Sequence, residues 1–129
     1  MKHFGILCPP GVGHLNNFMA LGDELQRRGH SVTLFGIPDV ESFAIAAQLN
    51  FCPIGAKKYP LGSNRRSQKL LSKLDGILAL IYTVELFRQG TQMVLESAPS
   101  AIKQQGTEVL LIDQVLFEGS TTDIIELNI

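Results

Sequence analysis

The stretch from Cys8 to Gly36 constrains the fold more than any other part of the sequence. It predicts the end of a strand over Phe4–Cys8, a glycine-containing turn, an amphipathic helix from about His14 to Arg28 and a strand over Ser31–Phe35. Gly29 lies where a left-handed cap would end the helix. A strand, a helix and a strand within about thirty residues form a βαβ unit, which implies parallel pairing and a right-handed crossover.

The rest of the sequence repeats this alternation. A second helix is predicted to begin with Asp39 as its N-cap and to end at Asn50, and it is followed by a strand over Phe51–Ile54 and a loop with a basic helical turn over 55–72. A long helix is predicted over Leu74–Ser97, with a bend or break at Gly90 and a stop at Pro99. The last predicted elements are a short helix over Ser100–Gln105, a strand over Glu108–Ile112 and a helix over Thr122–Leu127. Alternating elements of this kind form an α/β fold. We therefore expect one Rossmann-like domain over residues 1–129, a three-layer sandwich with a mostly parallel sheet in the strand order 3-2-1-4.

Composition excludes several classes of protein. Apolar residues make up 45% of the 129 residues and charged residues 18%, which is a globular composition. The net charge of −1 gives no electrostatic reason to expect nucleic acid as a partner. No apolar run reaches the roughly 18 residues of a membrane span. Cys8 and Cys52 lie in apolar runs, as expected of buried free thiols in a reducing compartment, so we expect a cytoplasmic protein.

Two polar residues follow strands that this topology places side by side. His14 lies in the loop after the first strand, and Asp113 directly follows the fourth. Ligands of open α/β sheets bind beyond the carboxyl ends of the strands, where the strand order reverses. A carboxylate beside an imidazole fixes its tautomer and stabilises the imidazolium, so the pair is suited to general-base catalysis. Structural roles stay open, because His14 could simply occupy the start of the helix and Asp113 could be an N-cap or a strand-end hydrogen-bonding residue.

Other kinds of site have weaker support. Gly11 and Gly13 resemble part of a dinucleotide-binding fingerprint, but the third glycine is absent and no acidic residue ends the second strand. There is no P-loop and no spacing typical of metal ligands, so no metal is expected. His3 is expected to be structural, and His30 is expected to be a surface turn residue.

Five short runs carry a more specific signal. They are GHLN at 13–16, ALGDEL at 20–25, RGHSVT at 28–33, LIDQ at 111–114 and GST at 119–121. In these runs the chain resembles the N-terminal half of the nucleotide-sugar-dependent glycosyltransferases of GT-B architecture, in particular the zeaxanthin glucosyltransferase and macrolide glycosyltransferase group. The sequence departs from that family at Asn17, where the family often has proline.

The resemblance implies a function for the protein. His14 corresponds to the histidine that deprotonates the acceptor hydroxyl, Asp113 to the aspartate that orients it, and Gly13, Asn16 and Gln114 fall among the expected acceptor-binding residues. A hexose would move from a nucleotide-sugar such as a UDP-sugar to a small lipophilic acceptor, a carotenoid or another natural product, with inversion and without a further cofactor. Lipophilic acceptors would place the enzyme near a membrane surface.

The resemblance also predicts an incomplete enzyme. The family binds its donor mainly through a C-terminal domain, and no motif of that domain is present. Ile129 reads as the start of another strand, so we expect a truncated domain that does not turn over alone and whose uncovered apolar face could cause self-association. Two alternatives remain from the residues themselves: a non-catalytic flavodoxin-like binding module, and half of a dinucleotide-dependent oxidoreductase.

Overall fold

The computed structural model describes residues 1–8, 10–113 and 124–126. Its elements in chain order are β1 His3–Leu7, α1 Val12–Arg27, β2 Ser31–Gly36, the 3₁₀ helix η1 Pro38–Val40, α2 Glu41–Ala46, β3 Asn50–Pro53, α3 Ser63–Leu71, α4 Gly76–Gln104, β4 Val109–Ile112 and β5 Ile124–Glu126. The order of strands and helices agrees with the alternation predicted from the sequence up to β4.

The strands form one sheet in the order β3-β2-β1-β4-β5. The first four are parallel, with β1 in the middle between β2 and β4. This order confirms the expected sheet and puts the carboxyl ends of β1 and β4 next to each other. Strand order reverses between these two strands, so the site expected at a reversal lies beyond their ends.

The last described strand corrects one prediction. A helix was expected over Thr122–Leu127, but Ile124–Glu126 is a strand paired antiparallel with β4. Two consecutive β-branched residues, Ile124 and Ile125, favour an extended backbone. The edge of β4 offers unpaired backbone groups for them. The other residues of the predicted helix lie outside the described part.

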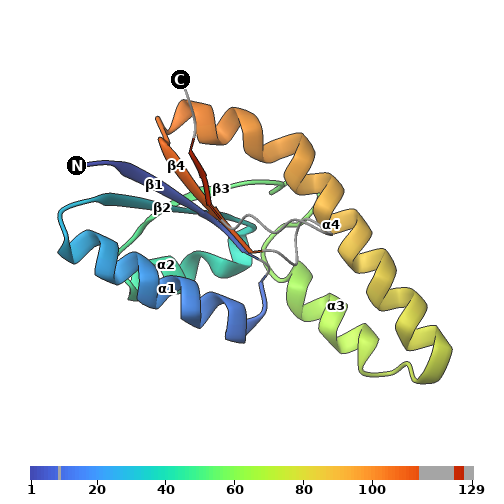
Figure 1. The fold of residues 1–129 in the computed structure, drawn as a ribbon. Helices are drawn as coiled ribbons and strands as arrows, with labels where there is room; N and C mark the ends of the chain where they lie inside the picture. Colours follow the sequence, from blue (N-terminus) through green and yellow to red (C-terminus); the bar gives the residue numbers. More distant parts are fainter. Residues whose placement is uncertain (9, 114–123, 127–129) are drawn as a thin grey trace.

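Helices cover both faces of the sheet (Figure 1). Helices α1 and α2 lie on one face, and the C-terminal part of α4 lies across the other, so the expected three-layer sandwich is confirmed. The centre is apolar, and Ile6, Leu15, Val32 and Leu34 have no exposed surface. Helix α1 can pack closely against Leu49 because Gly22 has no side chain. A Cβ at that position would lie only 2.8 Å from the side chain of Leu49. The βαβ unit thus fixes the start of α1 against the sheet.

Helix α4 is longer than predicted. It runs without interruption through Gly90 and Pro99, where a break and a stop were expected. Buried Met93, Val94 and Ala98 hold this part of the helix against the sheet. Pro99 itself is exposed, so water can bond the carbonyl oxygen that lacks its usual N–H partner. Packing on one face therefore overrides the local cost of proline.

Asp39 has a different role from the predicted one. It lies in η1, and it makes no capping bond to the helix that follows. Its carboxylate accepts the backbone N–H of Gly62 at 2.5 Å and that of Asn64 at 2.8 Å. Gly62 adopts a left-handed φ of 95°, which suits glycine at this turn. Asp39 thus supplies from η1 the N-terminal acceptor that α3 lacks locally.

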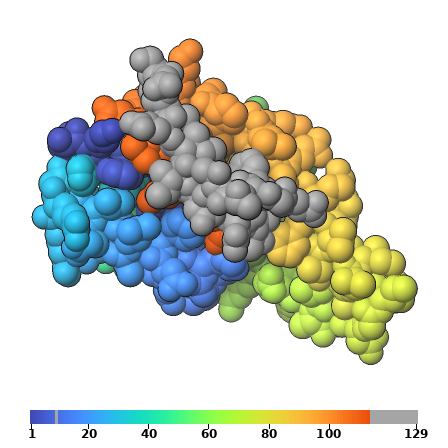
Figure 2. All heavy atoms as spheres, viewed as in Figure 1, coloured from blue at the N-terminus to red at the C-terminus, as the bar shows by residue number. Residues whose placement is uncertain are grey.

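Helix α3 and the N-terminal half of α4 form a hairpin that extends away from the sheet (Figures 1 and 2). In Figure 2 the yellow-green end of this hairpin projects from the body formed by the sheet and α1. Several large apolar side chains are exposed on the first half of α4, namely Ile77, Leu78, Leu80, Ile81, Val84 and Phe87. Among the described residues, no helix has the length and hydropathy needed to cross a bilayer.

Candidate active site

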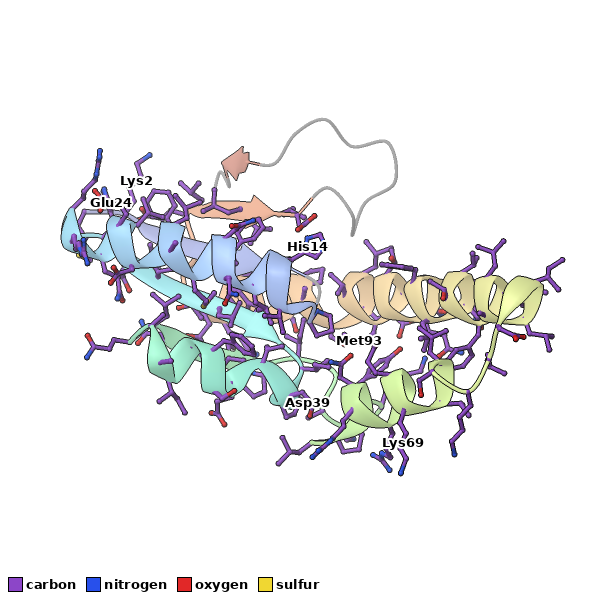
Figure 3. All side chains as sticks on the ribbon, turned by 90° about the horizontal axis from the view of Figure 1, so that it is seen from below. Lys2, His14, Glu24, Asp39, Lys69 and Met93 are labelled. Atoms are coloured by element: carbon purple, nitrogen blue, oxygen red, sulfur yellow. The ribbon has the colours of Figure 1, made fainter. Side chains whose placement is uncertain are left out.

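The turn between β1 and α1 positions His14. β1 ends at Leu7, and Gly11 caps α1 in an extended conformation. The N–H of Leu15 donates to the carbonyl oxygen of Gly11 at 2.9 Å, which closes the first turn of the helix. His14 is therefore on the first turn of α1, at the end of the helix nearest to α3 and α4 (Figure 3).

Asp113 reaches the same place from β4. Its backbone N–H donates to the carbonyl oxygen of Leu7 at 3.0 Å, so the ladder between β1 and β4 continues to this residue. The His14 Nδ1 atom lies 2.5 Å from Asp113 Oδ2. The prediction that these two residues, 99 positions apart, become neighbours is confirmed. Their catalytic roles stay a prediction at this point.

The pair has unequal access to solvent. The side chain of Asp113 is 9% exposed, whereas that of His14 is 44% exposed. A carboxylate only accepts hydrogen bonds, so a neutral His14 carries its proton on Nδ1 and leaves Nε2 as the accepting atom. The arrangement can take a proton from a ligand at Nε2 while Asp113 stabilises the resulting imidazolium.

Cys8 lies at the same end of β1 but has a different chemical character. Burial, with the negative charge of Asp113 as the smaller cause, raises the pKa of the Cys8 thiol to about 12. The thiol therefore stays protonated near neutral pH and is a poor nucleophile. Cys8 is buried as predicted, but Cys52 is only partly buried, because it lies on β3 at the edge of the sheet.

A cavity of about 560 Å³ opens beside His14. One wall is the turn before α1, with Pro10, Gly11 and Val12. The other walls come from Ile37, Tyr59 and the α3–α4 hairpin. A volume of this size suits a small organic ligand. His14 thus belongs both to the pair with Asp113 and to the lining of a cavity.

Sequence reasoning named no individual residue of the hairpin as part of this cavity. The hairpin residues that line it are Asn64, Ser67, Gln68, Leu71, Thr83, Leu86, Phe87, Gly90, Thr91 and Met93. The family resemblance implies that region 55–106 shapes the acceptor site, with the apolar helix at 74–95 as a possible acceptor wall, but the region has no distinctive motif that singles out a residue. The available signal was the regular three- and four-residue spacing of the polar residues in α3.

The other expected site residues lie apart from this cavity. Gly13 and Asn16 are exposed on α1, and neither is part of its lining. Asn16 instead lines a more open hollow of about 380 Å³ together with Asp23 and Phe43. Gln114 lies outside the described residues. The acceptor-binding roles of these three residues stay predictions.

His3 makes a structural contact, as expected, and so does His30. His3 Nε2 lies 2.7 Å from the hydroxyl of Thr33, and His30 Nδ1 accepts the backbone N–H of Lys2 at 3.0 Å. The His30 ring also meets the ring of Phe4 edge to face. In the part of the chain that the structure describes, no three potential metal-binding side chains gather in one place.

Comparison with known proteins identifies a family. The model of the glycosyltransferase family 28 N-terminal domain matches residues 11–116. This range includes His14 and Asp113. A search of the curated proteins found no significant match.

Solved structures with a similar fold are also glycosyltransferases. The glycosyltransferase of kitacinnamycin has a TM-score of 0.64 and 22% identity over 89% of this chain and 25% of its own. The calicheamicin glycosyltransferase CalG4 has a TM-score of 0.60 and 18% sequence identity, and the match covers 91% of this chain and 28% of CalG4. The spinosyn rhamnosyltransferase SpnG was solved with thymidine diphosphate. It has a TM-score of 0.52 and 18% sequence identity, and the match covers 90% of this chain and 30% of SpnG.

These structural likenesses confirm the Rossmann-like fold expected for the N-terminal half of a GT-B protein. The chain spans between 25% and 30% of the length of the three solved structures. The family model, in contrast, covers most of the chain, from Gly11 to Leu116. The protein therefore belongs to the family of glycosyltransferase family 28 N-terminal domains.

Proposed function

We propose that this chain forms the acceptor-binding half of an inverting glycosyltransferase. The observation that carries the proposal is the contact of His14 Nδ1 with Asp113 Oδ2 at 2.5 Å, at the edge of a cavity of about 560 Å³. The contact leaves Nε2 as the proton acceptor. Family membership supplies the class of reaction, and the paired side chains supply a base for it.

In the proposed reaction, Nε2 of His14 takes the proton of an acceptor hydroxyl. The acceptor oxygen forms a bond to the anomeric carbon of a hexose as the bond from that carbon to the nucleoside diphosphate breaks. The leaving diphosphate keeps the electron pair of the broken bond, and attack from the opposite side inverts the configuration. The Asp113 carboxylate stabilises the imidazolium that forms. General-base assistance of this kind typically contributes about 10² to 10⁴ in rate.

The donor is proposed to be a nucleotide-sugar such as a UDP-sugar, held mainly by a second, C-terminal domain. No further cofactor is required for this reaction. The spinosyn rhamnosyltransferase was solved with thymidine diphosphate, which is consistent with a nucleoside diphosphate as leaving group. Gly13, Asn16 and Gln114 are proposed to contact the acceptor as the two halves close around it.

The acceptor is proposed to be small and lipophilic, such as a carotenoid or another natural product. The enzyme is proposed to work in the cytoplasm close to a membrane. Apolar side chains of α4, including Leu86 and Phe87, line the cavity. Ile77 and Leu78 at the far end of the hairpin are more than half exposed, and exposed Lys73 precedes them. Exposed apolar groups beside a cation suit a bilayer surface.

Turnover by a protein in which a donor-binding half follows this chain tests the proposal. His14→Ala is expected to lower kcat by about 10² to 10⁴ and to leave the KM for the nucleotide-sugar unchanged, because the variant lacks only the base. His30→Ala is the matched control, since His30 contacts Lys2 and Phe4 away from the cavity. Equal turnover of His14→Ala and the parent would favour a non-catalytic binding module. The chain of 129 residues alone is expected to show no transfer.

A further inference from the structure

The inner face of α3 has an unusual composition for a helix that lines a cavity. Its lining residues Asn64, Ser67, Gln68 and Leu71 occupy positions i, i+3, i+4 and i+7, so they form one stripe. In a helix that packs on a core, this stripe is apolar. Here three of its four residues are polar, and α3 buries none of its residues. Core packing therefore does not explain why this face turns toward the cavity.

The polar groups of this stripe are available to a ligand. Among the residues that the structure describes, the side chains of Asn64, Ser67 and Gln68 form no hydrogen bond with one another or with a neighbour. Only the backbone N–H of Asn64 is engaged, by Asp39. A ligand that displaces water from these groups without replacing its hydrogen bonds loses affinity. The stripe thus favours ligands with polar atoms along one edge.

The facing wall of the cavity has the opposite character. The large lining residues of helix α4 are Leu86, Phe87 and Met93, and the helix also contributes Gly90 and two threonines, Thr83 and Thr91. Thr83, also in the lining, donates its hydroxyl to the carbonyl oxygen of Ala79 at 2.8 Å, so its hydrogen-bond donor is already used. A ligand between the two helices therefore meets hydrogen-bonding groups on one side and mainly apolar groups on the other.

We propose that α3 is a recognition helix for the acceptor and that the acceptor is amphiphilic. One face of the acceptor is apolar and packs on α4. One edge carries carbonyl, amide or hydroxyl oxygens that bond to Asn64, Ser67 and Gln68. This inference rests on the proposed function, because His14 defines the end of the cavity at which the reacting hydroxyl lies. It narrows the acceptor from a lipophilic alcohol to one with polar atoms distant from that hydroxyl.

The outer face of α3 provides matched controls. Arg65, Arg66 and Lys69 are exposed and are not part of the cavity lining. Figure 3 shows Lys69 on the side of α3 that faces away from α4. A substitution there changes the same helix without changing the proposed recognition face.

The test compares two phenols of similar length in binding to the isotope-labelled protein, observed by NMR. One probe is 4-hydroxybenzanilide, which has an amide between its rings, and the other is trans-4-hydroxystilbene, in which CH=CH replaces that amide. The double variant Asn64→Leu/Gln68→Met is expected to raise the Kd of the benzanilide about tenfold, as for the loss of about one good hydrogen bond, and not to raise the Kd of the stilbene. Lys69→Met is expected to change neither Kd. Equal changes for both probes, or no change for either, would overturn the inference.

The NMR signals of His14 separate this inference from the proposed function. If both probes shift the His14 ring signals but the α3 variant binds them as the parent does, the acceptor cavity stands and recognition by α3 is refuted. If neither probe shifts the His14 signals, the assignment of this cavity to the acceptor is refuted, and the inference with it. Shifts of the Asn64 and Gln68 side-chain amides by the benzanilide alone are the result we expect.

Discussion

At the scale of single residues, the site combines groups with different tasks at one end of the sheet. Asp113 is nearly buried and anchored through its backbone to Leu7, whereas the partner imidazole of His14 is partly exposed. Cys8 lies at the same end of the sheet, but burial and the charge of Asp113 raise the pKa of its thiol and so keep it protonated. Of these three side chains, only His14 has both access to a ligand and a proton-accepting atom.

The buried thiol of Cys8 should make stability depend on pH in alkaline solution. Burial raises the pKa of Cys8 from 9.0 to about 12, so the unfolded chain loses this proton before the folded one does. The stabilising contribution is complete below about pH 9 and falls as pH rises from there toward 12. At ~1.4 kcal/mol per pKa unit, the loss is at most a few kcal/mol.

Urea unfolding of the parent and of Cys8→Ala at pH 8 and at pH 10.5 measures this effect. We expect the free energy of unfolding to fall more steeply with pH in the parent than in the variant. Cys52→Ala is the control, because Cys52 is only partly buried. Parallel pH dependence of the parent and Cys8→Ala would contradict the assignment.

At the scale of elements, the hairpin is attached to the sheet by few but specific contacts. Asp39 holds the start of α3 through two backbone N–H groups, and Met93 of α4 lies against the backbone at Gly55. Helix α3 buries no residue, so its position depends on these attachments and on its contact with α4. The geometry of the cavity is therefore sensitive to residues that do not line it.

Asp39→Asn should loosen the start of α3. An amide has one accepting oxygen and no charge, so it cannot reproduce the two bonds that the carboxylate accepts. We expect amide hydrogen exchange at Gly62 and Asn64 to accelerate about tenfold, as for the loss of roughly 1.4 kcal/mol of local protection. Asp75→Asn is the matched control, because Asp75 precedes α4 and makes no capping bond. Unchanged exchange at both amides of Asp39→Asn would refute the role of Asp39.

Gly55→Ala should destabilise the protein. Gly55 has a φ of +64°, and a Cβ there would lie 2.5 Å from the sulfur of Met93. Steric displacement adds to backbone strain, so we expect a loss of about 1 to 3 kcal/mol in the free energy of unfolding. Gly29→Ala separates the two causes, since Gly29 has a φ of +88° and an added Cβ would meet no atom within 4 Å. Equal losses in urea unfolding would show that the contact with Met93 is unimportant.

The sequence was sufficient to predict elements with strong local patterns. The βαβ unit follows from periodicity, and the meeting of His14 with Asp113 follows once the strand order 3-2-1-4 of doubly wound sheets is assumed. Contacts between distant segments were not predictable in this way. The bond from Asp39 to Asn64 and the continuity of α4 through Pro99 depend on tertiary packing, which overrides local propensity.

At the scale of the whole molecule, the fold brings the His14–Asp113 pair to the edge of the cavity beside the start of α1. Four parallel strands place the pair, helices α1 and α2 cover one face of the sheet, and the α3–α4 hairpin closes the cavity from the side. The chain spans 25% to 30% of the length of the glycosyltransferases it resembles. Sugar transfer is therefore proposed for a protein that joins this domain to a donor-binding half.

The central claim is that His14 and Asp113 act as one unit on the acceptor proton. The most direct measurement is kcat for the parent, His14→Ala, Asp113→Asn and the double variant, each joined to the donor-binding half. If Asp113 acts only through the His14 ring, the double variant should lose no more activity than His14→Ala alone. Losses that multiply in the double variant, or an Asp113→Asn variant as active as the parent, would contradict this claim.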